Sequence, residues 1–263
     1  MRAFALLLAC SLSVASQSAD AKPLRAVSLN LCTDELLLAL ADDAQVASVS
    51  YLSRQSSETP YWQRARHFPA NDGSLLSVAA LKPDLVLTMG GGVRDRASIA
   101  GRLRIRVLDL PYPRSFADIE ASVARVAAAL GQQARGQQLL ERLRRLTRTS
   151  PAGAVDTIWL GGGGRTVPAT GLAAEWMRLA GLRQRAFRGD RVTLEQLLTS
   201  PPRVLLRSDY RQGEYSGEQR WMSHPLARRT RAGRTLATDG RRWTCMGPSL
   251  LPEILRLRRE LSS

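Results

Sequence analysis

The chain is poor in histidine, lysine and aromatic residues. Its 263 residues include two histidines, His67 and His224, two lysines, Lys22 and Lys82, and only 5% Phe, Trp and Tyr. Neither histidine sits in a pattern typical of a metal site or a catalytic triad. The sequence therefore argues against a hydrolase or a nucleotide enzyme, and we predict a protein that is not an enzyme.

No apolar run after the first residues approaches the length of about 18 that a membrane-spanning helix needs. The first residues have the order of an export signal: Arg2, the apolar stretch 3–9 and the Ala-Asp-Ala triplet at 19–21. Residues 1–21 are therefore predicted to be a signal peptide of a periplasmic protein. Residues 7–10 resemble a lipoprotein cleavage box, and acylation of Cys10 is the less favoured alternative.

The charge is strongly basic. Cleavage after residue 21 would remove Arg2 and Asp20 together, so the net charge of +15 would not change. Such a charge favours an anionic partner: nucleic acid, anionic lipid or an acidic small molecule. Export makes nucleic acid the least favoured of these, and a solvated Arg-rich surface without any function is the plain alternative.

Short apolar strands alternate with amphipathic helices, which predicts an α/β fold with mainly parallel sheets. The expected strands are 26–29, 46–49, 84–87, 106–110, 155–160, 203–206 and 234–237. The expected helices are one capped by Thr33, then 75–81, 97–103, 172–179, 194–198, 218–228 and 249–261.

A helical stretch from 116 to 148 separates the two halves of this pattern. Gly131 is expected to end its first helix as a C-terminal cap, and a second helix follows with an apolar stripe of leucines. This second helix would join the two halves rigidly. We therefore predict an N-terminal α/β lobe at 22–131, an interlobe helix at 132–150 and a C-terminal α/β lobe at 151–263.

Several short motifs resemble periplasmic binding proteins for cobalamin and iron siderophores, the substrate-binding proteins of ABC importers with a helical backbone (class III). They are R-A-V-S-L at 25–29 followed by T-D-E-L-L at 33–37, L-K-P-D-L-V-L at 81–87, the helix end at 128–131, L-A-G-L at 179–182, and the loop at 239–248. Together they cover nearly the whole mature chain in the expected order.

The resemblance implies two Rossmann-like lobes, joined by the long helix, with the ligand cleft between them. It implies a monomeric receptor that captures an anionic metal chelate, such as a ferric siderophore, cobalamin or a haem-like molecule. Its partners would be an ABC permease and the ATPase of that permease, and it would need no cofactor besides the transported chelate. Receptors for free zinc or manganese need several histidines, which this chain lacks.

In open α/β sheets the ligand contacts lie in the loops after the strands. Glycines in such loops let a flat ligand approach the backbone, arginines suit carboxylates, and Trp243 would stack on a planar ligand. For each loop a purely structural role is the alternative. The candidate ligand-binding residues are Cys32, Tyr51, Met89, Gly91, Arg94, Gly162, Arg165, Tyr210, Asp239, Arg241, Arg242, Trp243 and Cys245.

Docking onto the permease is expected through one exposed Glu on each lobe of proteins of this type. Glu195 occupies the position in the second lobe. The matching place in the first lobe reads Leu75-Leu76-Ser77 and holds no acid. Docking is therefore expected to be asymmetric, or to involve a different importer.

Signal cleavage would leave two cysteines, Cys32 after the first strand and Cys245 in the last cleft-facing loop. Three alternatives stay open: a disulfide that ties the lobes together, which export favours; two thiols that contact a soft metal; or two cysteines packed separately. A disulfide requires Cα atoms within about 7 Å, which a widely open cleft would forbid.

Two other functions remain as alternatives. A basic periplasmic protein that binds polyanions without an importer would explain the charge. A periplasmic enzyme is less favoured, because the glycine-rich run at 161–164 lacks the other residues of a nucleotide-binding motif.

Overall fold

The computed structural model describes residues 24–91, 97–102, 104–210, 225 and 233–263. The predicted signal peptide, Cys10, Arg94 and most of the helix expected at 218–228 lie outside the described residues. We call residues 24–131 the first lobe and residues 151–263 the second lobe, using the boundaries proposed from the sequence.

The first lobe contains a five-stranded parallel sheet in the order β3-β2-β1-β4-β5. The strand β3 was not predicted, because two residues are too short to show any alternation of apolar and polar side chains. The strands are β1 (Ala26–Ser28), β2 (Val46–Ser50), β3 (Ala70–Asn71), β4 (Leu85–Met89) and β5 (Arg106–Leu110).

The first helix of this lobe, α1, has a different N-terminal cap from the one that the sequence predicted. The cap of α1 is Asn30, whose side chain accepts a hydrogen bond from the backbone N–H of Thr33. Thr33 lies inside the first turn, because the cap lies three residues earlier than predicted. The helical segments here are α1 (Leu31–Leu40), η1 (Asp43–Gln45), η2 (Tyr51–Arg54), α2 (Trp62–Ala65), α3 (Leu75–Ala79) and α4 (Ala97–Arg102).

The second lobe contains a four-stranded parallel sheet in the order β7-β6-β8-β9. Its strands are β6 (Val155–Leu160), β7 (Leu182–Gln184), β8 (Val204–Ser208) and β9 (Arg234–Thr238). Its helical segments are η4 (Gly162–Gly164), α7 (Leu172–Leu179), α8 (Leu194–Thr199), α11 (Arg242–Cys245), η5 (Pro248–Leu250) and α12 (Leu251–Ser262). The three-residue β7 was missed, and the predicted α/β class with parallel sheets is confirmed.

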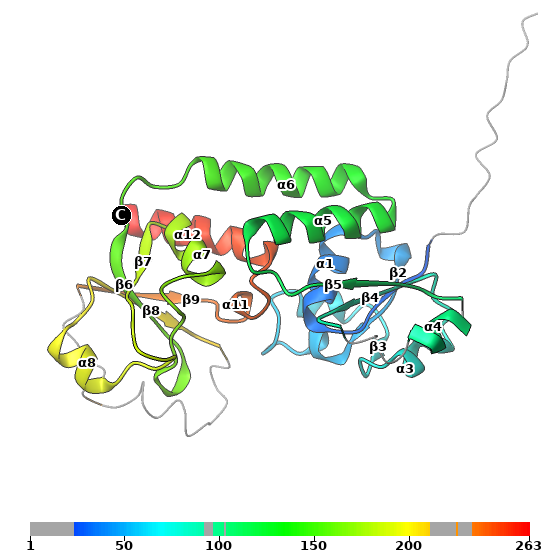
Figure 1. Cartoon of the computed structure of the whole chain (residues 1–263), viewed down its shortest axis with the longest axis horizontal. Coiled ribbons are helices and arrows are strands. Elements are labelled where there is room, and N and C mark those ends of the chain that lie inside the picture. The colour runs from blue at the N-terminus through cyan, green and yellow to red at the C-terminus, as the bar shows by residue number, and fades with distance from the viewer. Residues whose placement is uncertain (1–23, 92–96, 103, 211–224, 226–232) are drawn as a thin grey trace, which may run out of the picture.

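Two long helices link the sheets along one side of the molecule (Figure 1). The first, α5 (Phe116–Leu130), ends at Gly131, which has the left-handed conformation (φ 71°) that favours glycine. The second, α6 (Gln133–Arg148), then runs from the first lobe to the start of β6. The break predicted at Gly131 is confirmed.

One hydrophobic cluster extends through both lobes. It includes Leu37 of α1 and Val126 of α5 together with Trp176 of α7 and Leu257 of α12. The indole ring of Trp176 packs edge-on against Phe116, with 4.7 Å between ring centroids. The lobes therefore share a packed interior and do not meet only through a linker.

Candidate ligand site between the lobes

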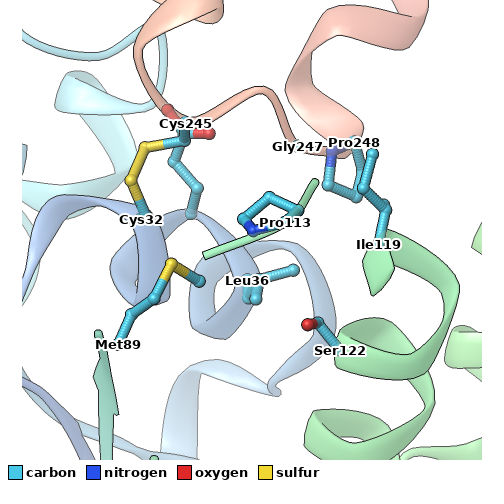
Figure 2. A pocket seen from close by; sticks show the side chains of 10 residues that line it. Cys32, Leu36, Met89, Pro113, Ile119, Ser122, Cys245, Gly247 and Pro248 are labelled. Carbon is cyan, nitrogen blue, oxygen red and sulfur yellow. A yellow bond between two sulfur atoms is a disulfide. The ribbon is translucent and has the colours of Figure 1, made fainter. Parts of the chain in front are cut away.

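The carboxyl ends of the two parallel sheets face each other. Cys32 follows β1, Met89 ends β4, and Pro113 follows β5, while Cys245 lies in the loop after β9 of the other lobe. These four residues line one cavity (Figure 2). Loops at strand carboxyl ends form the ligand sites of open α/β sheets, so this junction is the candidate site.

A disulfide joins the two lobes at this junction. Cys32 and Cys245 are bonded, their Cα atoms are 5.2 Å apart, and 213 positions separate them in the sequence. Of the three alternatives drawn from the sequence for these cysteines, the structure contains the disulfide. Figure 2 shows the bond beside Met89, and the shared cavity has a volume of about 20 Å³, room for about one water molecule.

A buried carboxyl group lines the same cavity. Glu35 of α1 is 4% exposed, and its Oε1 accepts a hydrogen bond from the Thr59 hydroxyl at 3.2 Å. Its Oε2 has no hydrogen-bond partner among the described residues. Burial raises the pKa of Glu35 to about 7, although the neighbouring Ser249 and Thr59 hydroxyls and the positive charge of Arg242 oppose the rise.

Asp34, the preceding residue of α1, is also fully buried but has several partners. Its Oδ1 accepts the backbone N–H of Ser50 at 3.0 Å, and its Oδ2 accepts the hydroxyls of Ser50 and Ser53. Burial raises the pKa of Asp34 to about 6, because these hydrogen bonds offset only part of the desolvation. Two adjacent buried carboxyl groups of the first lobe thus have raised pKa values.

Two polar contacts also cross between the lobes. The Tyr210 hydroxyl donates to Glu58 Oε2 at 2.8 Å. The Arg241 Nη1 donates to the backbone carbonyl of Ser56 at 2.8 Å. We call these the bridging contacts; with the disulfide they hold the loops after β8 and β9 against the segment after η2.

The arginines of the 239–248 loop are paired within the loop. Arg241 makes a bidentate pair with Asp239 at 2.8 and 2.9 Å, and Arg242 lies 3.3 Å from the same carboxylate. Burial alone would raise the pKa of Asp239, but the hydrogen bonds and charges of both arginines lower it overall. The guanidinium groups therefore stabilise this loop, and their contact with a ligand stays a prediction.

Trp243 does not offer the open stacking surface that the sequence predicted. It is 4% exposed, its Nε1 donates to the Thr238 hydroxyl at 2.8 Å, and its ring packs edge-on against Trp159. The indole faces inward because α11 turns Trp243 into the second lobe. Protein atoms therefore cover the ring faces.

Two tyrosines after strands of the first lobe remain accessible. Tyr51 follows β2 and is 50% exposed; Tyr112 follows β5 and is 64% exposed. Tyr112 was missed by sequence reasoning, although the rule that selected Tyr51 applies to it equally. A Cβ on Gly90 would lie 2.3 Å from the Tyr112 ring, so glycine lets the ring lie against the backbone. Next to it, the Gly91 N–H donates to the Asp109 carboxylate at 3.1 Å.

The remaining candidates lie at the edge of the second lobe. Gly162 is partly buried in the turn after β6, and Arg165 is exposed and pairs with Asp190 at 3.3 Å. The docking candidate Glu195 is exposed on α8. In the first lobe Leu76 of α3 is 83% exposed; α3 and α8 lie on different lobes, both away from α6 (Figure 1).

Two kinds of site are not found in the described part of the chain. Among these residues no three His, Cys, Asp or Glu side chains group together in a way that would hold a metal ion. The same residues contain no helix with the length and apolarity needed to cross a membrane.

Residues 27–236 match a family described as Periplasmic binding protein, and the chain belongs to that family. It is the substrate-binding family of ABC importers, whose members are transport components and not enzymes. No curated protein matches the chain significantly.

Solved structures share the fold. The periplasmic heme-binding protein HutB of Vibrio cholerae has a TM-score of 0.71 at 17% identity, over 91% of this chain and 99% of its own. The periplasmic heme-binding protein BhuT has a TM-score of 0.67 at 21% identity, over 90% and 97%. The siderophore-binding protein BauB has a TM-score of 0.68 at 12% identity, over 91% and 93%. The chain therefore has the class III binding-protein fold.

Proposed function

We propose that this protein is the periplasmic receptor of an ABC importer, that it captures an anionic metal chelate, and that it delivers the chelate to the inner-membrane permease. The exposed tyrosines Tyr51 and Tyr112, which follow β2 and β5 at the carboxyl edge of the first sheet, are the observation that carries this proposal. The class of chelate includes ferric siderophores, cobalamin and haem-like molecules.

The small cavity at the junction supports a ligand position outside it. A cavity of about 20 Å³ is far below the roughly 300–1,000 Å³ of a small-molecule pocket. We therefore expect the chelate to bind outside this cavity, in contact with Tyr51 and Tyr112. Three strand spacings separate β2 from β5, a distance of roughly 14 Å, so the two phenol rings would contact a broad, flat ligand at separate points.

The preference for an anionic ligand comes from charge. Arg165 is exposed at the edge of the second lobe, and the whole chain has a net charge of +15. A net positive charge attracts an anionic chelate from a distance, and exposed arginines suit its carboxylates.

Binding is tested by tryptophan fluorescence during titration with haemin, cyanocobalamin and a ferric siderophore. One of the three is expected to quench the emission with saturation. Tyr51→Ala and Tyr112→Ala should each weaken that ligand roughly tenfold, since an aromatic contact contributes about 1 kcal/mol beyond its buried area. Leu255→Ala, an exposed residue of α12, is the matched control.

Mass spectrometry of protein purified from its native periplasm would identify the chelate directly. A bound polyanion in place of a chelate, with strong salt-dependent binding to heparin, would favour the second candidate function, a basic protein without an importer. The net charge of +15 is the observation that keeps this second candidate.

We propose that docking onto the permease is asymmetric, with Glu195 on the second lobe and no acid at the matching place, residues 75–77, on the first. Glu195→Arg should reduce stimulation of the cognate importer's ATPase in vesicles, while chelate affinity stays unchanged. Leu76→Glu, which adds an acid to the first lobe, should preserve or raise the stimulation. Equal ATPase stimulation by the Glu195→Arg variant and the parent protein would contradict the docking role.

A further inference from the structure

The two ends of the interlobe disulfide have different surroundings. Cys32 is only partly buried at the start of α1, whereas Cys245 is 7% exposed at the end of α11. Both residues line the cavity of Figure 2. A thiolate reagent therefore has its better approach to the sulfur of Cys32, and Cys245 would be the leaving group.

Glu35 is placed to act on that leaving group. It stands one helical turn after Cys32 on α1 and lines the same cavity as both cysteines. Its Oε2 is buried and has no hydrogen-bond partner among the described residues. An unpartnered carboxyl oxygen is costly in an interior, and the nearby Ser249 hydroxyl, itself without a partner among the described residues, does not close a hydrogen bond to it. Glu35 therefore lies in the cavity of the disulfide with a carboxyl oxygen that the chelate site does not use.

We propose that Cys32, Cys245 and Glu35 form a thiol–disulfide exchange site that accepts two electrons from a dithiol, such as a periplasmic dithiol protein. Reduction removes the covalent tie between the lobes and leaves the bridging contacts in place. This redox role is separate from ligand capture, and it does not depend on which ligand, if any, the protein binds.

The exchange balances as follows. A thiolate of the dithiol attacks the Cys32 sulfur, the Cys32–Cys245 bond breaks, and the electron pair leaves on Cys245. Protonated Glu35 gives its proton to this buried thiolate. The second thiol of the reagent, as thiolate, then attacks the mixed disulfide, and Cys32 departs and takes a proton from solvent. Glu35 regains its proton from solvent, and the reagent has become a disulfide.

The groups around Glu35 come from several elements. Asp34 of α1 disfavours its ionisation by charge, and Arg242 of α11 favours it. The nearby hydroxyls of Ser249 and Thr59 favour it too, the second through its hydrogen bond to Oε1. Tyr61 also lies close enough for the Glu35 charge to raise its own pKa, after the larger effect of burial. With burial as the dominant effect, the pKa of Glu35 near 7 leaves a proton available below neutral pH.

The test is the rate at which dithiothreitol reduces the folded mature protein between pH 6 and 8. Free thiols are trapped with a maleimide and counted by mass spectrometry, and each rate is divided by the thiolate fraction of the reagent. The corrected rate should fall about tenfold across this range, as Glu35 loses its proton. In Glu35→Gln it should change less than twofold.

Glu58→Gln is the matched control, because Glu58 is also buried between the lobes but does not line this cavity. This variant should keep the tenfold fall. A rate that rises with pH would overturn the proposal, because it would mean reduction through unfolding as Glu35 ionises. Equal profiles for the parent protein and Glu35→Gln would overturn it too. If Glu35→Gln lost its near-ultraviolet circular dichroism, the profile of the parent protein would decide alone.

Discussion

The two lobes differ in the pKa values of the carboxyl groups that lie where they meet. The first lobe buries Asp34 and Glu35, and burial raises the pKa of both carboxyl groups, to about 6 and about 7. The second lobe presents Asp239 between two arginines, which lower its pKa. One side of the junction holds protons near neutral pH, whereas the other holds a permanent ion pair, and the disulfide crosses between them.

This difference has a consequence for stability against pH. The unfolded chain releases the protons of Asp34 and Glu35 near pH 4, whereas the folded chain keeps them until about pH 6 and 7. The contribution of these two carboxyl groups to the free energy of unfolding is therefore complete below pH 4 and falls as the pH rises toward 7. Asp239 behaves in the opposite way: its stabilisation is full above its unfolded pKa and is lost as pH falls through its lowered pKa.

The disulfide should give the largest effect when it is removed. In Cys32→Ser/Cys245→Ser the unfolding free energy should fall by about 5 kcal/mol, because the bond closes a very long loop in the unfolded chain. Urea denaturation measures the loss. The parent protein in reductant should match the variant, and an unchanged midpoint after bond removal would show that the tie contributes no stability.

Glu35→Gln should remove the acid with the larger pKa rise. At pH 8 the variant should be more stable than the parent protein by up to about 3 kcal/mol, since it avoids ionising a buried group. At pH 4 the two should be equal. Thermal melts at both pH values check this, and a constant difference between pH 4 and 8 would exclude ionisation as its source.

Asp239→Asn tests the opposite lobe. It should cost about 1–2 kcal/mol at pH 7, because Arg241 and Arg242 lose their shared carboxylate. The cost should shrink as the pH falls below about 4, because the unfolded chain takes up the Asp239 proton there before the folded carboxylate does. The measurement is denaturant unfolding at pH 7 and pH 3; a cost that grows on acidification would rule out the ion pair as the cause.

Tyr210→Phe should give the smallest effect. It removes the hydroxyl that bridges to Glu58 and should cost about 1 kcal/mol. Hydrogen exchange of backbone amides in η2 and the loop after β8 should quicken, while amides of α12 serve as the internal reference. Unchanged exchange in both segments would mean that the bridging contact does not hold the loops.

The sequence predicted the elements whose patterns repeat. Strands such as 106–110 and 155–160, the helix 172–179 and the break at Gly131 all appear as expected, because apolar periodicity and helix caps are local signals. The strand β3 was missed because two residues carry no period, and β7 because its sequence Leu-Arg-Gln holds a single apolar residue, unlike the equally short β1. Tyr112 was not predicted, although it follows a strand just as Tyr51 does.

The sequence by itself determined the α/β class, the family and the candidate loops. The alternation of strands and helices, the glycines and the short motifs are all local features of the sequence. Only the tertiary structure decided which of these residues meet. It turned Trp243 inward, paired Arg241 and Arg242 with Asp239, and bonded Cys32 to Cys245. It also placed Glu35 in the cavity that both cysteines line, with an Oε2 that has no hydrogen-bond partner in the described part of the chain. Burial and pairing are properties of neighbours that are distant in sequence, and no local pattern specifies them.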